Sequence, residues 1–248
     1  MTDDELQMAS AATAALFALT FLFGGRVHPM RKIIGDRRII VSFGAGVSTA
    51  YLFVRLMPEL AEARETLSAA AATALPLDGM IVYFVAMIGF LLVYGLDHFR
   101  RTSDTVAAGT EGEVPGAEAR YRAYGMAPYV LLLTYVIVKE SAVSMVAMAQ
   151  YACAIAFHFL AVDHSLRDEM GSVYDARGRF ILAAMCVLGW ALAATTHVQE
   201  WVLALLLAFM SGAVIVNGAV MELPTDRNGR FWSFALGSLM FGLVLMAV

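Results

Sequence analysis

Charged residues are scarce in this chain, and cysteine is nearly absent. Of its 248 residues, 15% are charged and 60% are apolar, whereas soluble domains carry about 25% charged residues. The mean hydropathy is +0.71. Cys153 and Cys186 both lie inside apolar runs, which excludes a disulfide framework and a paired-cysteine metal site. The net charge of −4 does not favour binding to nucleic acid, so no nucleic-acid partner is expected. The composition predicts an integral membrane protein.

Long apolar runs predict an all-α fold with eight transmembrane helices. At roughly 20 residues per crossing, the 248 residues hold about eight helices and no separate soluble domain, so residues 1–248 form a single transmembrane domain. The runs are long and do not alternate as strands would. The predicted helices cover residues 8–25, 39–60, 79–99, 127–147, 150–166, 179–196, 200–222 and 231–248. The polar stretch at about 100–125 predicts a mobile cytoplasmic linker.

The distribution of Lys and Arg predicts the orientation of these helices. Fourteen of the 17 cationic residues fall in the loops after the first, third, fifth and seventh predicted helices. The termini and the other loops hold only Arg64, and Arg55 and Lys139 lie within helices. Because cytoplasmic loops are enriched in Lys and Arg, both termini are expected to be extracytoplasmic. We expect a multi-pass protein of a prokaryotic inner membrane, with the lipid bilayer as its partner.

A few ionisable residues lie at membrane depth, where each costs at least about 2.5–3.5 kcal/mol. Lys139 and Glu140 lie on the fourth predicted helix, and His158 and Asp163 lie on the fifth. At 1.5 Å per residue, Lys139 is roughly 18 Å above the inner end and His158 roughly 12 Å below the outer end. These depths coincide in a core of about 30 Å. Since the two helices are joined by a very short connection, we expect Lys139 or Glu140 to face His158 in a polar centre.

Two structural interpretations compete with a functional one at this centre. Lys139 could be held by Glu140, Asp163 or backbone carbonyls and simply pin two helices together. A hydrogen bond between helices is as good an interpretation of His158 as a ligand role. Further ionisable side chains lie nearer the helix ends: Glu59 towards the outer end of the second helix, and Asp97 and Glu222 towards inner ends.

Several short motifs occur in order on the predicted helices. Each motif combines small residues or a Gly-Phe step with an acid or a His further along the same predicted helix. The motifs are Ser42–Val47 with Arg55–Glu59, Gly89–His98, Ala154–His158, and Ser211–Gly212 with Glu222–Pro224. Together they resemble the ZIP (Zrt/Irt-like) divalent-metal transporters over nearly the whole chain. The resemblance implies a ZIP-like bundle with helices 2, 4, 5 and 7 inside and an inverted repeat that relates helices 1–3 to helices 6–8. Small residues would permit close helix approach in that bundle, namely Gly44, Gly46, Ser211, Gly212 and Gly218.

The resemblance also implies a metal centre between helices 4 and 5, where each His has an acid one helical turn away. On the fourth helix of this chain, Tyr135 or Val136 takes the His position and Lys139 or Glu140 takes the acid position, depending on a one-residue choice. The fifth helix keeps the His, His158. The acid one turn further on is replaced by Val162, and Asp163 follows it.

Two functions follow from these residues, and neither is enzymatic. In the first, the protein transports a divalent cation of the zinc, iron or manganese class. His158, Glu140 and Asp163 would bind the cation, with Lys139, Glu59, Asp97 and Glu222 along its pathway. In the second, the protein is a non-transporting ZIP-like scaffold or accessory membrane subunit in which the Lys139 ammonium replaces the metal, because a fixed cation repels another. No resident cofactor is expected, and a homodimer or larger membrane assembly is compatible with either function.

Overall fold

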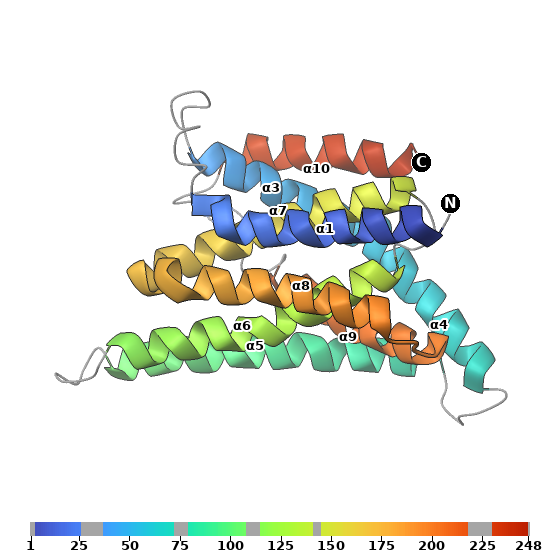
Figure 1. The fold of residues 1–248 in the computed structure, drawn as a ribbon, viewed down its shortest axis with the longest axis horizontal. Helices are drawn as coiled ribbons and strands as arrows, with labels where there is room; N and C mark the ends of the chain where they lie inside the picture. The colour runs from blue at the N-terminus through green and yellow to red at the C-terminus, as the bar shows by residue number, and fades with distance from the viewer. Residues whose placement is uncertain are drawn as a thin grey trace.

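The fold is a bundle of long, roughly antiparallel helices (Figure 1). A computed structural model describes residues 3–25, 37–71, 79–107, 115–140, 145–217 and 230–247, and no strand occurs in these ranges. The helices are α1 (Asp3–Phe23), α3 (Arg37–Tyr51), α4 (Met57–Ala71), α5 (Ile81–Ala107), α6 (Pro115–Glu140), α7 (Met145–Met170), α8 (Arg179–Thr195), α9 (Glu200–Val216) and α10 (Phe231–Met246). Counting α3 and α4 as one bent helix, the described residues form eight helices. The all-α prediction is confirmed, and both termini lie at the same end of the bundle (Figure 1).

The bend between α3 and α4 has a local cause. Pro58, the second residue of α4, has no N–H, and its ring would crowd the carbonyl of Val54 in a regular helix. The chain instead forms a π-helical turn over Leu52–Leu56, in which the N–H of Met57 donates to the carbonyl of Leu52. The wider turn makes room for the proline. The two halves of the helix then point in different directions (Figure 1), with Arg55 at the bend.

A tight reversal joins α7 to α8. Gly171 adopts a φ of 53°, a left-handed conformation that ends helices and that glycine adopts without strain. Its N–H donates to the carbonyl of Arg167 at 3.0 Å. A second π-helical turn, Tyr174–Gly178, then leads into α8. This reversal brings Tyr174 back over the last turns of α7.

The boundaries of the middle helices differ from the sequence prediction. The predicted linker at about 100–125 is helical at both sides, because α5 extends to Ala107 and α6 begins at Pro115, while residues 108–114 lie outside the described residues. Helix-forming residues outside the apolar run prolong both helices. The end of α6 also moves, from the predicted residue 147 to Glu140. Lys139 therefore lies one residue from a helix end and not in the middle of a span.

Four helices form a closed ring of contacts at the centre of the bundle. The bent α3–α4 helix packs on α7 and on α9, and α6 packs on both α7 and α9. The other helices cover this ring: α1 packs on α7 and α8, α8 on α6, α5 on α9, and α10 on α3. The four inner helices are the second, fourth, fifth and seventh along the chain.

Glycines allow two of these helix pairs to approach closely. Between α3 and α10, and again between α5 and α9, each helix offers one glycine to the backbone of the other. A Cβ at any of the four would overlap a carbonyl oxygen of the partner helix: Gly46 meets Phe234, Gly237 meets Phe43, Gly89 meets Phe209, and Gly212 meets Ala86. Gly46 and Gly212 thus allow close helix approach, but to the covering helices α10 and α5 and not between the four inner helices as predicted. Gly44 instead faces the Phe157 ring, Ser211 donates to the carbonyl of Leu207 within its own helix, and Gly218 lies outside the described residues.

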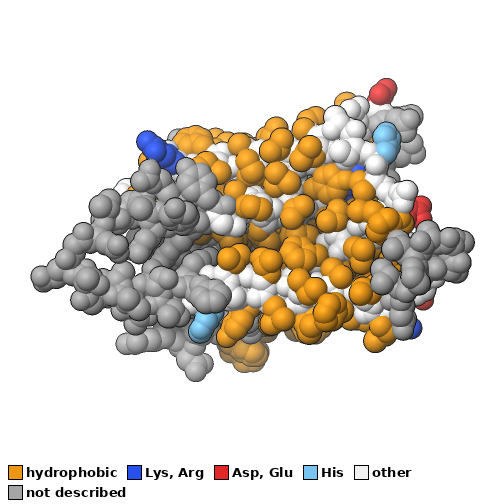
Figure 2. Space-filling model, turned by 90° about the horizontal axis from the view of Figure 1, so that it is seen from below, with side chains coloured by type: hydrophobic (Ala, Val, Ile, Leu, Met, Phe, Trp, Pro, Cys, Tyr) orange, Lys and Arg blue, Asp and Glu red, His pale blue; other side chains and the backbone are white. Residues whose placement is uncertain are grey.

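The outer surface of the bundle is strongly apolar. Figure 2 shows hydrophobic side chains across the middle of one face, with charged groups towards its ends. On α5 alone, large apolar side chains are exposed at Phe84, Met87, Ile88, Leu91 and Leu92. Two helical segments, Asp4–Phe23 and Tyr174–Thr195, are long and apolar enough to cross a membrane, and three shorter helices are also apolar. Membrane association is therefore supported by exposure as well as by composition.

Candidate functional site

The centre of the ring holds a buried histidine. His158 on α7 is 1% exposed, and its Nε2 shares a hydrogen bond of 2.7 Å with the hydroxyl of Tyr129 on α6. The two rings meet edge to face, with centroids 5.9 Å apart. His158 therefore contacts the fourth helix, as predicted. Its partner is Tyr129, which the sequence analysis did not single out.

Lys139 does not face His158. Its Nζ donates to the carbonyl oxygen of Thr196 at 2.5 Å, where α8 has ended, and the Tyr135 hydroxyl bonds the Thr196 side chain at 3.0 Å. Lys139 follows Tyr129 by ten residues, about 15 Å along the helix axis. The prediction that Lys139 and His158 lie at the same depth is wrong, because α6 ends at Glu140 and not at residue 147. Of the alternatives for Lys139, the structure shows the bond to a backbone carbonyl.

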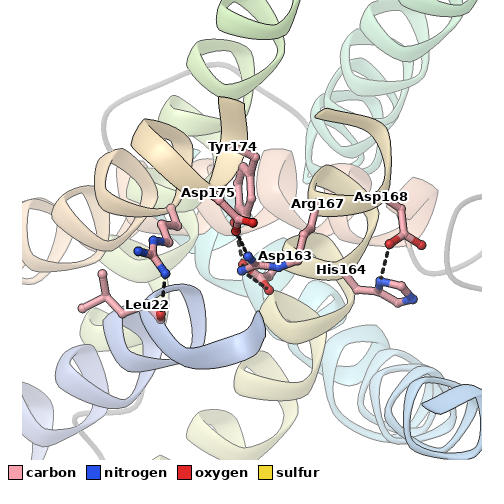
Figure 3. A network of polar contacts seen from close by, with 8 residues as sticks. Leu22, Asp163, His164, Arg167, Asp168, Tyr174 and Asp175 are labelled. Atoms are coloured by element: carbon pink, nitrogen blue, oxygen red, sulfur yellow. Dashed lines mark hydrogen bonds and ion pairs between the residues drawn. The ribbon is translucent and has the colours of Figure 1, made fainter. Parts of the chain in front are cut away.

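Asp163 belongs to a polar network at the end of α7, which we call the inner network: Asp163, Arg167, Tyr174 and Asp175 (Figure 3). Asp163 is 1% exposed. Nη2 of Arg167 donates to both carboxylate oxygens, at 2.9 and 3.1 Å. The Tyr174 hydroxyl adds a bond of 2.7 Å to Oδ1. Arg167 also pairs with Asp175. Both oxygens of Asp163 are thus held by an arginine.

The end of α1 closes over the inner network. A Cβ at Gly24 would meet the Asp163 carboxylate, and one at Gly25 would meet the Arg167 guanidinium. Nη1 of Arg179 donates to the carbonyl of Leu22 at 3.5 Å. These contacts tie α1, α7 and α8 together at this end, and Gly24 and Gly25 pack directly on the network.

A second polar group lies at the opposite end of α7, and we call it the outer cluster: Tyr51, Arg55, Glu59, Glu140 and Tyr151. Glu59 is 6% exposed. Its Oε1 accepts hydrogen bonds from Arg55 Nε at 2.8 Å and from the Tyr151 hydroxyl. Arg55 Nε also lies 3.3 Å from the Tyr151 hydroxyl, and its guanidinium stands 5.2 Å from the Tyr151 ring centroid. One carboxylate oxygen is therefore well paired.

Two other polar atoms of the outer cluster lack a partner among the residues that the structure describes. Within the described part of the chain, Glu59 Oε2 and the Tyr51 hydroxyl are buried and have no hydrogen-bond partner. The Tyr51 ring is 1% exposed and meets the Tyr151 ring edge to face at 5.8 Å. The charge of Glu140 acts on both Glu59 and Tyr51. An unsatisfied carboxylate oxygen and hydroxyl in a buried position mark a place where a polar ligand can bind.

The structure separates the residues predicted to bind metal. His158 bonds Tyr129, Asp163 bonds Arg167, and Glu140 lies in the outer cluster. Over the described ranges, no three His, Cys, Asp or Glu side chains are grouped so that they could hold a metal ion. The predicted three-ligand centre is therefore not assembled. Of the pathway residues, Glu59 lies near the start of α4 and not at the end of the second helix, which continues to Ala71. The Asp97 side chain lies outside the described parts of α5, and Glu222 lies outside the described residues altogether.

Sequence reasoning missed the tyrosines that complete each polar group. A usable signal exists for one of them, because Tyr51, Arg55 and Glu59 follow each other at steps of four residues, which places them on one side of a helix. Tyr129, Tyr151 and Tyr174 carry no such signal, since each reaches its partner from another segment of the chain.

The sequence matches no protein-family model and no curated protein. The resemblance to the ZIP transporters therefore stays a prediction carried by the motifs.

Proposed function

We propose that this chain is a multi-pass membrane protein that transports a divalent cation of the zinc, iron or manganese class, as its resemblance to the ZIP family implies. The observation that carries the proposal is a pair of buried polar side chains on one side of α7, facing the central ring, where Tyr151 bonds Glu59 of α4 and His158 bonds Tyr129 of α6. Both side chains are buried and lie about 10 Å apart along the axis of α7. Buried ionisable groups inside an apolar bundle are typical of ion pathways.

The helix pairings support the ZIP-like inverted repeat. An exchange of α1 with α8, α3–α4 with α9, α5 with α10 and α6 with α7 converts the five strongest helix pairings into pairings that are also observed. The α3–α10 pair becomes the α9–α5 pair, and the α1–α7 pair becomes the α8–α6 pair, while α1–α8 and α4–α9 are converted into themselves. The glycines follow the same exchange, because Gly46 corresponds to Gly212 and Gly237 to Gly89. This pattern is expected of an inverted repeat in a transporter.

The exterior supports eight membrane crossings with both termini outside. Apolar side chains cover the exposed faces of α5, α8 and α10, although a water-soluble helix buries its apolar face. The eight helices alternate in direction, so that the ends of α1, α5, α7 and α9 that precede the Arg-bearing loops lie at one side of the bundle (Figure 1). By the charge rule this side is cytoplasmic.

A non-transporting scaffold or accessory subunit is the second candidate, and the inner network favours it. Arg167 supplies both Asp163 oxygens with a fixed positive charge, and a cation in that place would be repelled. The version of this candidate that relies on Lys139 gains no support from the bond between Lys139 and Thr196. Arg167, not Lys139, is the cation beside a predicted ligand.

Uptake by proteoliposomes tests the proposal. Vesicles that contain the purified protein and a metal-sensitive dye should show uptake of zinc, iron(II) or manganese. The His158→Ala variant should lose this uptake while it remains folded, because His158 lies on the pathway. His197→Ala is the matched control, since His197 is exposed in the turn between α8 and α9. Normal uptake by His158→Ala would end the role of His158, and absence of uptake of all three metals by the wild type would support the scaffold.

A further inference from the structure

We infer that Glu59, Tyr51 and Glu140 form an oxygen-lined binding site for a divalent cation at the outer end of the bundle. The site deepens the proposed transport function, on which it rests, by giving the cation a first binding position. It is separate from the central histidine, because Tyr151 of the outer cluster precedes His158 by seven residues, about 10 Å along α7.

Unpaired oxygens provide the first argument. Among the described residues, Glu59 Oε2 and the Tyr51 hydroxyl have no partner although both side chains are more than nine-tenths buried. Buried polar atoms are nearly always satisfied by protein, water or a bound ion. Arg55 and Tyr151 already satisfy Oε1, so they hold the carboxylate in place and leave Oε2 to an outside ligand.

The charge of the outer cluster provides the second argument. Glu140 lies close enough for its charge to act on Glu59. With Arg55, the two acids give the outer cluster a formal charge of −1. A divalent cation has the opposite sign, and partial burial strengthens the attraction relative to water.

Donor chemistry then selects the kind of cation. Every candidate ligand atom is a carboxylate or phenol oxygen, and oxygen donors suit hard ions such as Mn²⁺, Mg²⁺ and Ca²⁺ better than ions that prefer nitrogen or sulfur. The Arg55 side chain is 43% exposed and can move towards solvent when a cation arrives. We therefore assign the outer cluster to a hard divalent cation, with Mn²⁺ as its best probe.

Electron paramagnetic resonance of Mn²⁺ tests this site without any transport. The full chain in nanodiscs of zwitterionic lipid is titrated with Mn²⁺, and the loss of the free-ion signal reports binding. The wild type should bind one Mn²⁺ at the outer cluster. Glu59→Gln and Glu140→Gln should each weaken binding by at least about tenfold, since even indirect ligand changes have effects of 10–100-fold. Glu65→Gln, the same change at an exposed position of α4, should have no effect.

Two further results separate this site from the central one. His158→Ala should keep Mn²⁺ binding at the outer cluster even if it loses uptake, so failure of transport leaves the site testable. Mn²⁺ binding that is unchanged in both Glu59→Gln and Glu140→Gln would overturn the inference. So would a wild type that binds no Mn²⁺, because the cluster would then hold only water. If Glu59→Gln does not fold, Glu140→Gln decides alone, since Glu140 is partly exposed at the end of α6.

Discussion

The two ends of α7 carry similar polar groups in different states. Each has a buried carboxylate, an arginine four residues away on the same helix, and a tyrosine hydroxyl from another segment. In the inner network, Arg167 and Tyr174 occupy the Asp163 carboxylate, and the end of α1 covers them. In the outer cluster, Arg55 and Tyr151 bind only one oxygen of Glu59.

The difference shows how one set of residue types can serve structure or binding. The Arg167 side chain is 12% exposed whereas that of Arg55 is 43% exposed. A buried ion pair with all its oxygens satisfied holds helices together, and removal of one partner leaves a charge stranded. A carboxylate with one oxygen unpaired among the described residues, beside a partly exposed arginine, can accept a ligand. We therefore assign stability to the inner network and cation recognition to the outer cluster.

The largest expected effect is on stability at the inner end. Asp163→Ala should lower the free energy of unfolding by about 3–5 kcal/mol, because it strands the buried Arg167 charge. Glu59→Gln should cost far less, because Arg55 can reach solvent. Thermal or SDS unfolding in detergent measures both. A second change, Arg167→Met, should restore much of the stability that Asp163→Ala loses. Equal losses at the two ends would contradict the comparison.

Removal of the Arg55 charge should strengthen cation binding at the outer cluster and change the stability of the protein little. Arg55→Gln removes a positive charge from the outer cluster, so Mn²⁺ should bind several-fold more tightly. Unfolding should change by no more than about 1 kcal/mol, as for partly exposed ion pairs. Arg64→Gln, an exposed position on the same helix, is the control for total charge. Weaker binding by Arg55→Gln would mean that Arg55 chiefly orients Glu59.

The smallest effect is expected from one hydroxyl. Tyr51→Phe removes a buried oxygen that has no partner among the described residues, so without cation the protein should be unchanged or stabilised by up to about 1 kcal/mol. The same variant should bind Mn²⁺ a few-fold more weakly. Tyr174→Phe, which removes a hydroxyl bonded to Asp163, should instead be destabilising. A clear loss of stability in Tyr51→Phe would show that its hydroxyl has a structural partner.

The helices were easier to predict than the contacts between them. All eight apolar runs became helices, because long runs of Ala, Leu and Met leave few other options for the backbone. The ends were less certain, since α6 ends at Glu140, before the end of its apolar run, and this moved Lys139 from the middle of a helix to its end. The expected centre of His158, Glu140 and Asp163 therefore did not form, although each residue proved to be at least partly buried.

The sequence by itself determined the number of helices, their alternating direction and the ionisable residues that had to find partners, because hydropathy and charge act locally along the chain. Only the tertiary structure decided which partners those residues found. Tyr129, Tyr151 and Thr196 lie 29, 92 and 57 residues from the groups they bond, and such pairings depend on helix length, bend and rotation together. The π-helical turn at Pro58 and the early end of α6 set those quantities. Among the described residues, they left one oxygen of Glu59 without a partner, whereas both oxygens of Asp163 are paired.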